Sequence, residues 1–288
     1  MTVGLSRLCR WGLFPTVLAI GMYLGTQLGC EPSEGPRPGA QQVPGRAVPP
    51  SADATTAEQS AALNRKSWVP PVFAEHQRER DEMVRVIRET YGMRDAAVLK
   101  AMATVPRHEF VAPAYVAEAY ADHPLPTFYG QTISQPSIVA EMTHQLHLQE
   151  GEKVLEVGTG SGYQAAVLTH FTTQVYTIEI IKPMADSAAE RLKRLGYGVV
   201  RVRCGDGFFG WPEAAPFDAI LVTFTVERVP EKLLAQLKPG GRMVIPVADA
   251  DGMEWLTILE KSPAGEVATR RLFPVRFVPM LREDPSRK

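Results

Sequence analysis

Three acidic side chains stand beside glycine-containing turns in the second half of the chain. Glu156 precedes the run Gly158-Thr159-Gly160-Ser161-Gly162, Glu179 ends a second apolar run, and Asp206 lies between two glycines. Carboxylates repel phosphate groups, but they accept hydrogen bonds from ribose hydroxyls, an ammonium group or an adenine amine. Taken singly, Glu179 and Asp206 are explained equally well as solvated loop acids. Together with the glycine run, the three acids predict a site for a nucleoside without a polyphosphate.

The glycine run lets the backbone turn sharply and approach a ligand closely, because glycine has no Cβ. The helix expected after it presents free N–H groups at the same place. Two other nucleotide loops are excluded. The dinucleotide fingerprint needs a glycine where Tyr163 stands, and a P-loop needs Gly-Lys-Ser/Thr, which is absent here.

The elements that must position these residues are short apolar runs alternating with helical segments from residue 153 onward. We expect strands at Lys153–Val157, Val175–Ile178, Val199–Val202, Phe217–Val222, Met243–Val247, Trp255–Glu260 and Leu272–Val278. Helices are expected at Ala165–Phe171, Lys182–Leu195 and Pro230–Leu237, the last followed by a turn at Pro239-Gly240-Gly241. This alternation predicts an α/β fold with a doubly wound, mostly parallel sheet. Helical patterns near Val72, from Asp95 and after Pro136 predict an N-terminal helical subdomain.

The first 72 residues differ in character from the rest. Arg7 and Arg10 precede an uncharged run that ends at Gly29-Cys30, so residues 1–29 are predicted to be a signal peptide or membrane anchor. The small residue before Cys30 resembles a bacterial lipoprotein site, at which the cysteine is lipidated. An uncleaved hydrophobic N-terminus and a mis-assigned start codon are the alternatives. Residues 30–72 are rich in Pro, Gly and Ala and predict a flexible linker, which leaves 73–288 as the folded domain.

Composition excludes several other classes of protein. The 288 residues carry 31 Lys+Arg against 32 Asp+Glu, so no strongly basic domain is left to bind nucleic acid. Nucleic acid is therefore not expected as a partner. Three cysteines are too few for a disulfide scaffold. His144 and His147 have no Cys, Asp or Glu set at ligand spacing beside them, so no metal site is predicted. A monomer is the expected state.

Several motifs together resemble one enzyme family. The run Val154 to Tyr163 looks like the S-adenosylmethionine loop of class I methyltransferases, which have a Rossmann-like fold. The block Gly130-Gln131-Thr132-Ile133-Ser134-Gln135-Pro136 is more specific, and it resembles the protein-L-isoaspartate O-methyltransferases. Further matches are Val105-Pro106-Arg107-His108-Glu109-Phe110-Val111, Gly205-Asp206-Gly207, Pro216-Phe217-Asp218-Ala219-Ile220 and Val275-Arg276-Phe277-Val278-Pro279. The resemblance covers about residues 80 to 282.

The resemblance implies an activity, a cofactor and a set of site residues. Members of this family methylate the α-carboxylate of L-isoaspartyl residues in damaged proteins with S-adenosylmethionine, which begins their repair. By position, Ser134 would be the active-site serine. The substrate side would hold Thr132, Gln135 and Arg276. The residues that would surround the cofactor are Glu156, Gly158, Thr159, Gly160, Gly162, Glu179, Asp206 and Gly207.

The chemistry implied by the resemblance needs few groups. A carboxylate with a pKa of about 4 is ionised at neutral pH, so it needs no general base to attack a methyl sulfonium. The rate is then expected to come from alignment in a dry pocket. Ser134 can donate a hydrogen bond that orients the carboxylate. Because it stands two residues before Pro136, it can equally be the N-cap of a helix.

Two segments depart from the family pattern, and both are expected to flank the active site. Thr127-Phe128 replaces the usual Ile-Gly, and Phe224-Thr225-Val226 replaces small residues and a proline. The added phenylalanines leave two alternatives open: a methyltransferase for another peptide or small-molecule carboxylate, and a tethered cofactor- or peptide-binding module without turnover. The family resemblance implies a cytoplasmic protein, whereas the N-terminus predicts export or anchoring.

Overall fold

The computed structural model describes residues 67–282. The predicted signal or anchor at 1–29 and most of the linker predicted at 30–72 lie outside the described residues. Within the described part, no helix is both long enough and apolar enough to cross a bilayer.

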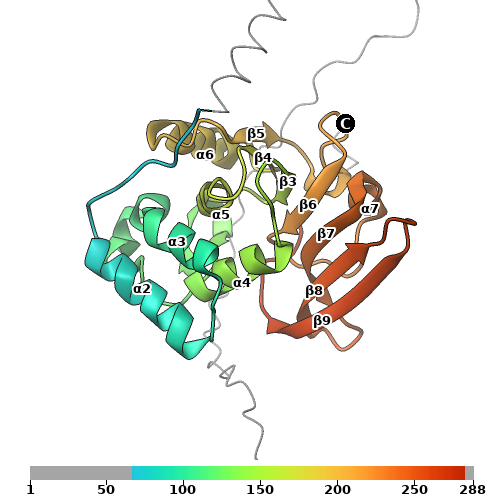
Figure 1. Ribbon diagram of the computed structural model, residues 1–288, viewed down its shortest axis with the longest axis horizontal. Helices are drawn as coiled ribbons and strands as arrows, with labels where there is room; N and C mark the ends of the chain where they lie inside the picture. The colour runs from blue at the N-terminus through green and yellow to red at the C-terminus, as the bar shows by residue number, and fades with distance from the viewer. Residues whose placement is uncertain (1–66, 283–288) are drawn as a thin grey trace, which may run out of the picture.

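A seven-stranded sheet forms the centre of the fold, in the order β5-β4-β3-β6-β7-β8-β9 (Figure 1). Its strands are β3 Lys153–Val157, β4 Gln174–Glu179, β5 Arg201–Cys204, β6 Phe217–Val222, β7 Leu237–Ala248, β8 Glu254–Lys261 and β9 Val267–Val275. The five strands β3 to β7 are parallel, and β8 pairs antiparallel with both β7 and β9. The predicted doubly wound, mostly parallel sheet is confirmed. The strand order reverses direction beside β3, which is where such sheets bind ligands.

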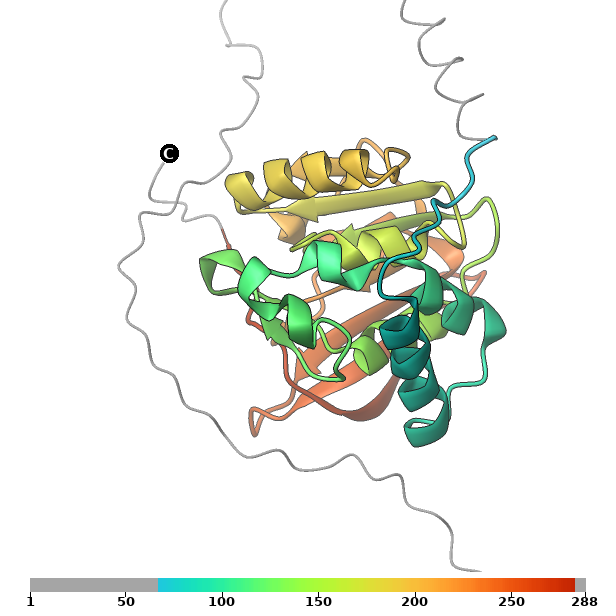
Figure 2. The same cartoon turned by 90° about the vertical axis from the view of Figure 1, so that its left-hand side faces the viewer.

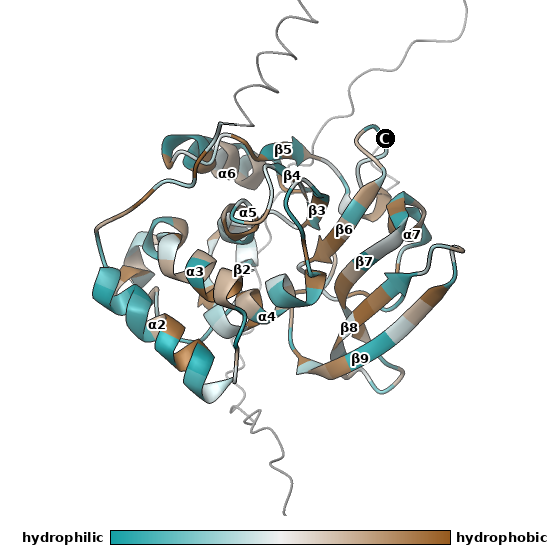
Figure 3. Ribbon diagram, viewed as in Figure 1, coloured by the Kyte–Doolittle hydropathy of each residue, from teal (hydrophilic) through white to brown (hydrophobic). Residues whose placement is uncertain are grey.

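Both faces of the sheet are buried, each in its own core. Along β3, Val154 packs into one hydrophobic cluster, whereas Leu155 and Val157 pack into the other. Helices that cover the sheet include α5 Tyr163–Leu168 and α6 Lys182–Arg194 on the first core and α7 Glu231–Gln236 on the second. Figure 2 shows α6 running alongside the β4–β5 edge of the sheet. Strands buried on both faces are apolar throughout, and β3 and β6 are largely so (Figure 3).

The N-terminal helical subdomain is confirmed as α2 Gln77–Thr90, α3 Ala96–Thr104 and α4 Pro136–Leu146. The predicted start of α3 at Asp95 is its N-cap, because this side chain accepts hydrogen bonds from the backbone of Ala97 and Val98. The other carboxylate oxygen of Asp95 lies 2.9 Å from Nδ1 of His144, which ties α4 to α3. Short 3-10 turns connect these helices: η1 Arg107–Phe110, η2 Pro113–Glu118 and η3 Phe128–Gly130.

Several predicted boundaries are wrong. Helix α2 begins at Gln77 instead of Val72, after His76 in a left-handed conformation. Strand β5 begins at Arg201 instead of Val199, because a turn closed by Val200 N–H and Tyr197 O follows α6. Strand β9 spans Val267–Val275 instead of Leu272–Val278, because it pairs with the whole length of β8.

The predicted turn at Pro239-Gly240-Gly241 is an irregularity within β7 instead of a break before it. Phe217 on β6 pairs with Leu237, and Ala219 already pairs with Arg242. The extra residues on β7 therefore bulge out between two paired positions, and the strand continues beyond them.

Candidate active site

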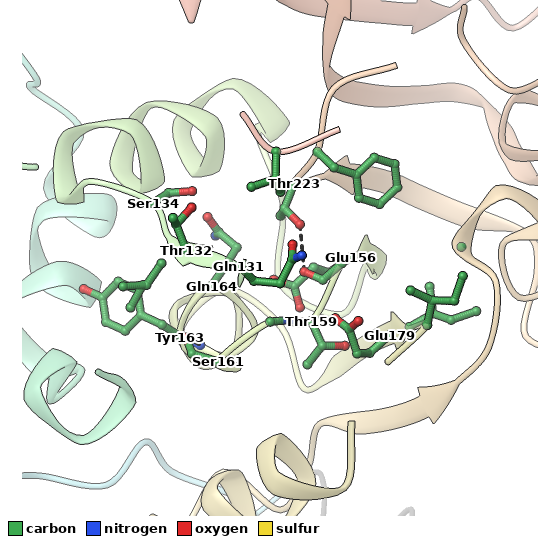
Figure 4. A pocket seen from close by; sticks show the side chains of 18 of the residues that line it. Gln131, Thr132, Ser134, Glu156, Thr159, Ser161, Tyr163, Gln164, Glu179 and Thr223 are labelled. Carbon is green, nitrogen blue, oxygen red and sulfur yellow. Dashed lines mark hydrogen bonds between the residues drawn. The ribbon is translucent and has the colours of Figure 1, made fainter. Parts of the chain in front are cut away.

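A cavity opens at the carboxyl end of β3, where the strand order reverses (Figure 4). One wall is the glycine run with the ends of β3 and β4. A second wall is the segment Gln131–Ser134, which precedes α4. Residues from the far end of the chain, Val278, Pro279 and Leu281, close a third side. The predicted cofactor loop and the predicted active-site segment therefore line one cavity.

The glycine run follows β3 tightly because its backbone needs conformations that favour glycine. Gly158 has φ +100°, and a Cβ there would lie 2.2 Å from Oγ1 of Thr223. Gly160 and Gly162 also have positive φ. The N–H of Gly158 donates to Ile178 O at 2.9 Å, which fastens the run to β4. Gly158 and Gly160 thus present bare backbone to the cavity, whereas Gly162 is the N-cap of α5, packs against Leu192 and does not line the cavity.

Glu156 lines the cavity as a wholly buried carboxylate. Oγ1 of Thr177, its neighbour on β4, donates to Oε2 at 2.5 Å. The other oxygen, Oε1, is buried without a hydrogen-bond partner among residues 67–282. Burial raises the pKa of Glu156 to about 8, with a further contribution from the charge of Glu179. An unpartnered buried carboxylate oxygen suits a cationic ligand group such as an ammonium.

Glu179 closes the same side of the cavity and is only 6 % exposed. Its two oxygens accept backbone hydrogen bonds from Gly160 and Ile181, each at 3.0 Å. Burial raises the pKa of Glu179, and these backbone hydrogen bonds oppose that rise. Each carboxylate oxygen has two acceptor sites, so a ribose hydroxyl can still be accepted on either one.

Asp206 is buried beside the cavity, and the residue that follows it, Gly207, lines the wall. Oδ1 of Asp206 accepts the N–H of Phe208 at 2.9 Å. Oδ2 lies 3.0 Å from Nε of Arg282, whose guanidinium carbon is 3.6 Å from the ring centroid of Phe208. Sequence reasoning missed Arg282, because nothing in its local pattern marks it as a contact of a residue 76 positions earlier.

The predicted active-site serine and the residues predicted on the substrate side divide into two groups. Ser134 and Thr132 line the cavity, with Gln131 beside them (Figure 4). Gln135 does not line it, since its amide donates to Oδ2 of Asp122 at 3.3 Å and to Oγ of Ser137 at 2.7 Å. Arg276 is exposed and is not part of the cavity wall.

The interpretation of Ser134 as a helix cap is wrong. The N-cap of α4 is Gln135, and its side chain makes no capping hydrogen bond. The hydroxyl of Ser134 has no hydrogen-bond partner within the described part of the chain. Ser134 is therefore left available to a ligand in the cavity.

The two phenylalanines that depart from the family pattern lie in different places. Phe224 lines the cavity and lies against Gly158, where an added Cβ would meet the phenyl ring at 3.2 Å. Phe128 is 57 % exposed, and together with Tyr129 it lines an adjoining hollow that shares Gly160 and Ser161 with the cavity. Of the two phenylalanines, Phe224 is thus the one that narrows the cavity itself.

Comparison with known proteins relates the chain to one family. The family described as protein-L-isoaspartate(D-aspartate) O-methyltransferase matches residues 78–284. Protein-L-isoaspartate O-methyltransferase 1 of Nitrosospira multiformis is 54% identical over 215 residues, which are 74% of this chain and 91% of that protein. Protein-L-isoaspartate O-methyltransferase 2 of Syntrophobacter fumaroxidans is 55% identical over 205 residues, 70% of this chain and 83% of that one.

Two solved structures are similar in fold. One, titled protein-L-isoaspartate O-methyltransferase, has a TM-score of 0.64 and 31% identity; the match covers 69% of this chain and spans 65% of that protein's length. The other is a Plasmodium falciparum protein in complex with S-adenosyl-L-homocysteine, with a TM-score of 0.63, 23% identity, and coverage of 70% of this chain and 98% of that one. By the match over residues 78–284 and the identity to its relatives, this chain belongs to the protein-L-isoaspartate O-methyltransferase family.

Proposed function

We propose that this protein transfers the methyl group of S-adenosylmethionine to the α-carboxylate of L-isoaspartyl residues in damaged proteins, which initiates their repair. The observation that carries the proposal is the single cavity lined by both Glu156 and Ser134. In this cavity, a site suited to a cationic nucleoside lies next to the segment that the family resemblance assigns to the substrate carboxylate. Family membership and the names of the relatives support the same reaction.

The cofactor's ammonium group is assigned to Glu156, whose Oε1 is buried without a partner among the described residues. Gly158 and Gly160 offer bare backbone to the ligand, with Thr159 holding the loop through a 2.7 Å contact between its Oγ1 and that of Thr177. Glu179 is assigned to the ribose hydroxyls. At the next strand end, Asp206 and Gly207 are assigned to the adenine. When bound, S-adenosylmethionine supplies an electrophilic methyl group on a sulfonium.

On the substrate side, the protein has to orient the isoaspartyl carboxylate that accepts the methyl group. An isoaspartyl carboxylate is already ionised at neutral pH, with a pKa of about 4, so no residue has to remove a proton. The Ser134 hydroxyl can donate a hydrogen bond to one carboxylate oxygen and leave the other free to attack. Ile133, Val139 and Met142 are buried residues that line the same cavity and keep water away from the reacting atoms.

A methyl-transfer assay tests this function directly. The full chain is incubated with S-adenosylmethionine and a peptide that contains isoaspartate, and the control is the same peptide with ordinary aspartate. We expect a methyl ester on the first peptide alone. Ser134→Ala is expected to lower turnover by about tenfold or more, as for a lost transition-state hydrogen bond, while the affinity for S-adenosylhomocysteine stays within a factor of about two. Cofactor binding without any transfer would instead indicate a binding module, and transfer only to another carboxylate would reassign the substrate.

For the N-terminus we propose export or membrane anchoring by residues 1–29, with 30–72 as a linker and a monomeric enzyme domain at 73–288. The basic residues Arg7 and Arg10 ahead of an uncharged run, and the Gly29-Cys30 pair, support this. Cell fractionation with mass spectrometry of the mature N-terminus tests it. A lipidated Cys30, a cleaved N-terminus, or an intact N-terminus in the membrane fraction is expected, and an intact N-terminus in the cytoplasmic fraction would contradict the proposal. The mass of the purified domain, measured by analytical ultracentrifugation, tests whether the domain is a monomer.

A further inference from the structure

The segment that carries Ser134 connects two elements of the fold. It lies between the two-residue strand β2 Thr132–Ile133 and the start of α4 at Pro136. Within residues 67–282, no hydrogen bond to the Ser134 hydroxyl fixes its direction. The position of that hydroxyl therefore depends on what holds β2 and what holds the first turn of α4.

The first turn of α4 is capped by a residue from another segment. Asp122 accepts the Ser137 backbone N–H on Oδ1 at 2.8 Å and the Ser137 hydroxyl on Oδ2 at 2.9 Å. The helix's own N-cap, Gln135, supplies no side-chain cap. A carboxylate at this end of a helix satisfies free N–H groups and interacts favourably with the helix dipole. Asp122 thus takes the place of the missing local cap.

The same carboxylate also holds the residue next to Ser134. The Gln135 amide donates to Oδ2 of Asp122 at 3.3 Å and to the Ser137 hydroxyl at 2.7 Å. On the other side, Tyr91 hydrogen-bonds to Asp122, and burial together with this bond raises the pKa of Tyr91 to about 12. Asp122 therefore joins the end of α2 to the residues that follow Ser134.

The other end of the Ser134 segment is fastened by residues close to Asp122 in the chain. Strand β1 Leu125–Pro126 pairs antiparallel with β2, with Leu125 opposite Ile133. Because β1 follows Asp122 closely in the chain, the stretch 122–126 holds the Ser134 segment on both sides. The fully buried Arg107 donates from Nε to Ala119 O at 2.8 Å, which anchors the chain just before this stretch.

We propose that Asp122 is a positioning residue for methyl transfer, which acts through the α4 N-terminus to aim the Ser134 hydroxyl into the cavity. The proposal rests on the proposed function, in which Ser134 orients the acceptor carboxylate. It also reassigns Gln135 from substrate contact to this supporting network. Asp122 itself touches neither substrate nor cofactor in this scheme.

A double-mutant cycle separates positioning from general support of the fold. Asp122→Ala is expected to lower kcat on an isoaspartyl peptide by about tenfold, since small misplacements of aligned groups are costly. The affinity for S-adenosylhomocysteine is expected to stay unchanged. In a Ser134→Ala background, the same substitution is expected to have no further effect on kcat. Asp122→Asn keeps an acceptor for the Ser137 N–H and is expected to retain most of the activity.

Glu118→Ala serves as the matched control, because Glu118 is an exposed carboxylate in the preceding turn, where it lies 3.5 Å from His123. Its kcat is expected to equal that of the wild type. An equal loss from Asp122→Ala in both Ser134 backgrounds would overturn the proposal. A parallel loss of cofactor affinity would do the same, because it would show a defect of the whole fold.

Hydrogen exchange gives a readout that does not depend on the substrate. In Asp122→Ala, amide exchange is expected to accelerate in residues 131–138 and to stay unchanged in the glycine run, whereas Glu118→Ala changes neither. Unchanged exchange in residues 131–138 would overturn the proposal. If the wild type failed to methylate isoaspartyl peptides while this exchange pattern held, the proposed function would fail and the role of Asp122 in placing Ser134 would stand.

Discussion

Thr177 Oγ1 donates to Glu156 Oε2 across the β3–β4 pair at 2.5 Å, and it leaves Oε1 of the same carboxylate buried without a partner among the described residues. A charge in this position is costly, and burial raises the pKa of Glu156 to about 8. The unliganded protein therefore holds Glu156 mostly protonated at neutral pH. A ligand ammonium would stabilise the ionised form, so ligand binding and proton release are coupled at this residue.

The first prediction concerns the pH dependence of cofactor binding. The ionised form of Glu156 is the one that accepts an ammonium, and it becomes populated as pH rises through about 8. The affinity for S-adenosylhomocysteine is therefore expected to increase from pH 6.5 to 8.5. Titration calorimetry in buffers with different ionisation enthalpies measures both the affinity and the released proton.

Glu156→Gln is the matched variant for this measurement. It is expected to weaken binding by about tenfold or more, since a hydrogen bond to a charged group contributes about 1.5–3 kcal/mol. It is also expected to remove the additional proton release. If the variant kept the wild-type proton release, another group would have to carry the coupling.

The second prediction concerns the stability of the unliganded protein. Because the folded pKa of Glu156 is raised, its contribution to stability is fully present below the unfolded pKa of about 4.5 and is lost as pH rises through about 8. Glu156→Gln has no such loss. The Tm of the variant relative to the wild type is therefore expected to increase between pH 5 and pH 8. A Tm difference that stayed constant over this range would contradict a buried, protonated Glu156.

Local sequence patterns predicted the core of this site because its parts are contiguous in the chain. The strand at 153–157 and the glycine run are recognised directly from neighbouring residues, and the start of α3 from Asp95 just before it. The parallel sheet then brings the ends of β3 and β4 to one edge. Glu156 and Glu179 both line the cavity for this reason.

Side-chain contacts between distant segments were not predictable in the same way. Arg282 reaches Asp206 over 76 residues, and Asp122 reaches Ser137 over 15, through loops whose paths no local pattern specifies. Gln135 fell within a recognisable motif, but its side chain turns toward Asp122 instead of the cavity. A motif thus located the segment, while tertiary packing decided which of its side chains face the cavity.

The third prediction compares two glycines that both have a positive φ. Gly158 and Gly92 both have positive φ, so Ala costs about 1–2 kcal/mol of backbone strain at either. A Cβ on Gly158 would also lie 2.2 Å from Thr223 Oγ1, whereas one on Gly92 meets nothing within 4 Å. Gly158→Ala is therefore expected to abolish measurable cofactor binding, and Gly92→Ala to lower only the Tm. Calorimetry and thermal unfolding of both variants check this, and equal cofactor affinity in the two would refute a close backbone approach at Gly158.

The last prediction concerns the ion pair between Arg282 and Asp206. Asp206 has a 3 % exposed side chain and Arg282 a 43 % exposed one, so the pair covers a carboxylate that the proposed function assigns to the adenine amine. The amine and the guanidinium would then compete for Oδ2. Because a partly exposed pair contributes at most about 1 kcal/mol, Arg282→Ala is expected to tighten S-adenosylhomocysteine binding by up to about fivefold at low salt.

The dependence of S-adenosylhomocysteine affinity on ionic strength distinguishes this competition from other effects of Arg282. Screening weakens the ion pair, so wild-type affinity is expected to approach that of Arg282→Ala as ionic strength rises. Arg271→Ala is the control, because Arg271 is another exposed arginine, 3.9 Å from Asp249, and it is not part of the cavity wall. It is expected to leave binding unchanged. Weaker binding in Arg282→Ala would mean that the guanidinium, stacked on Phe208, supports the nucleoside instead of competing with it.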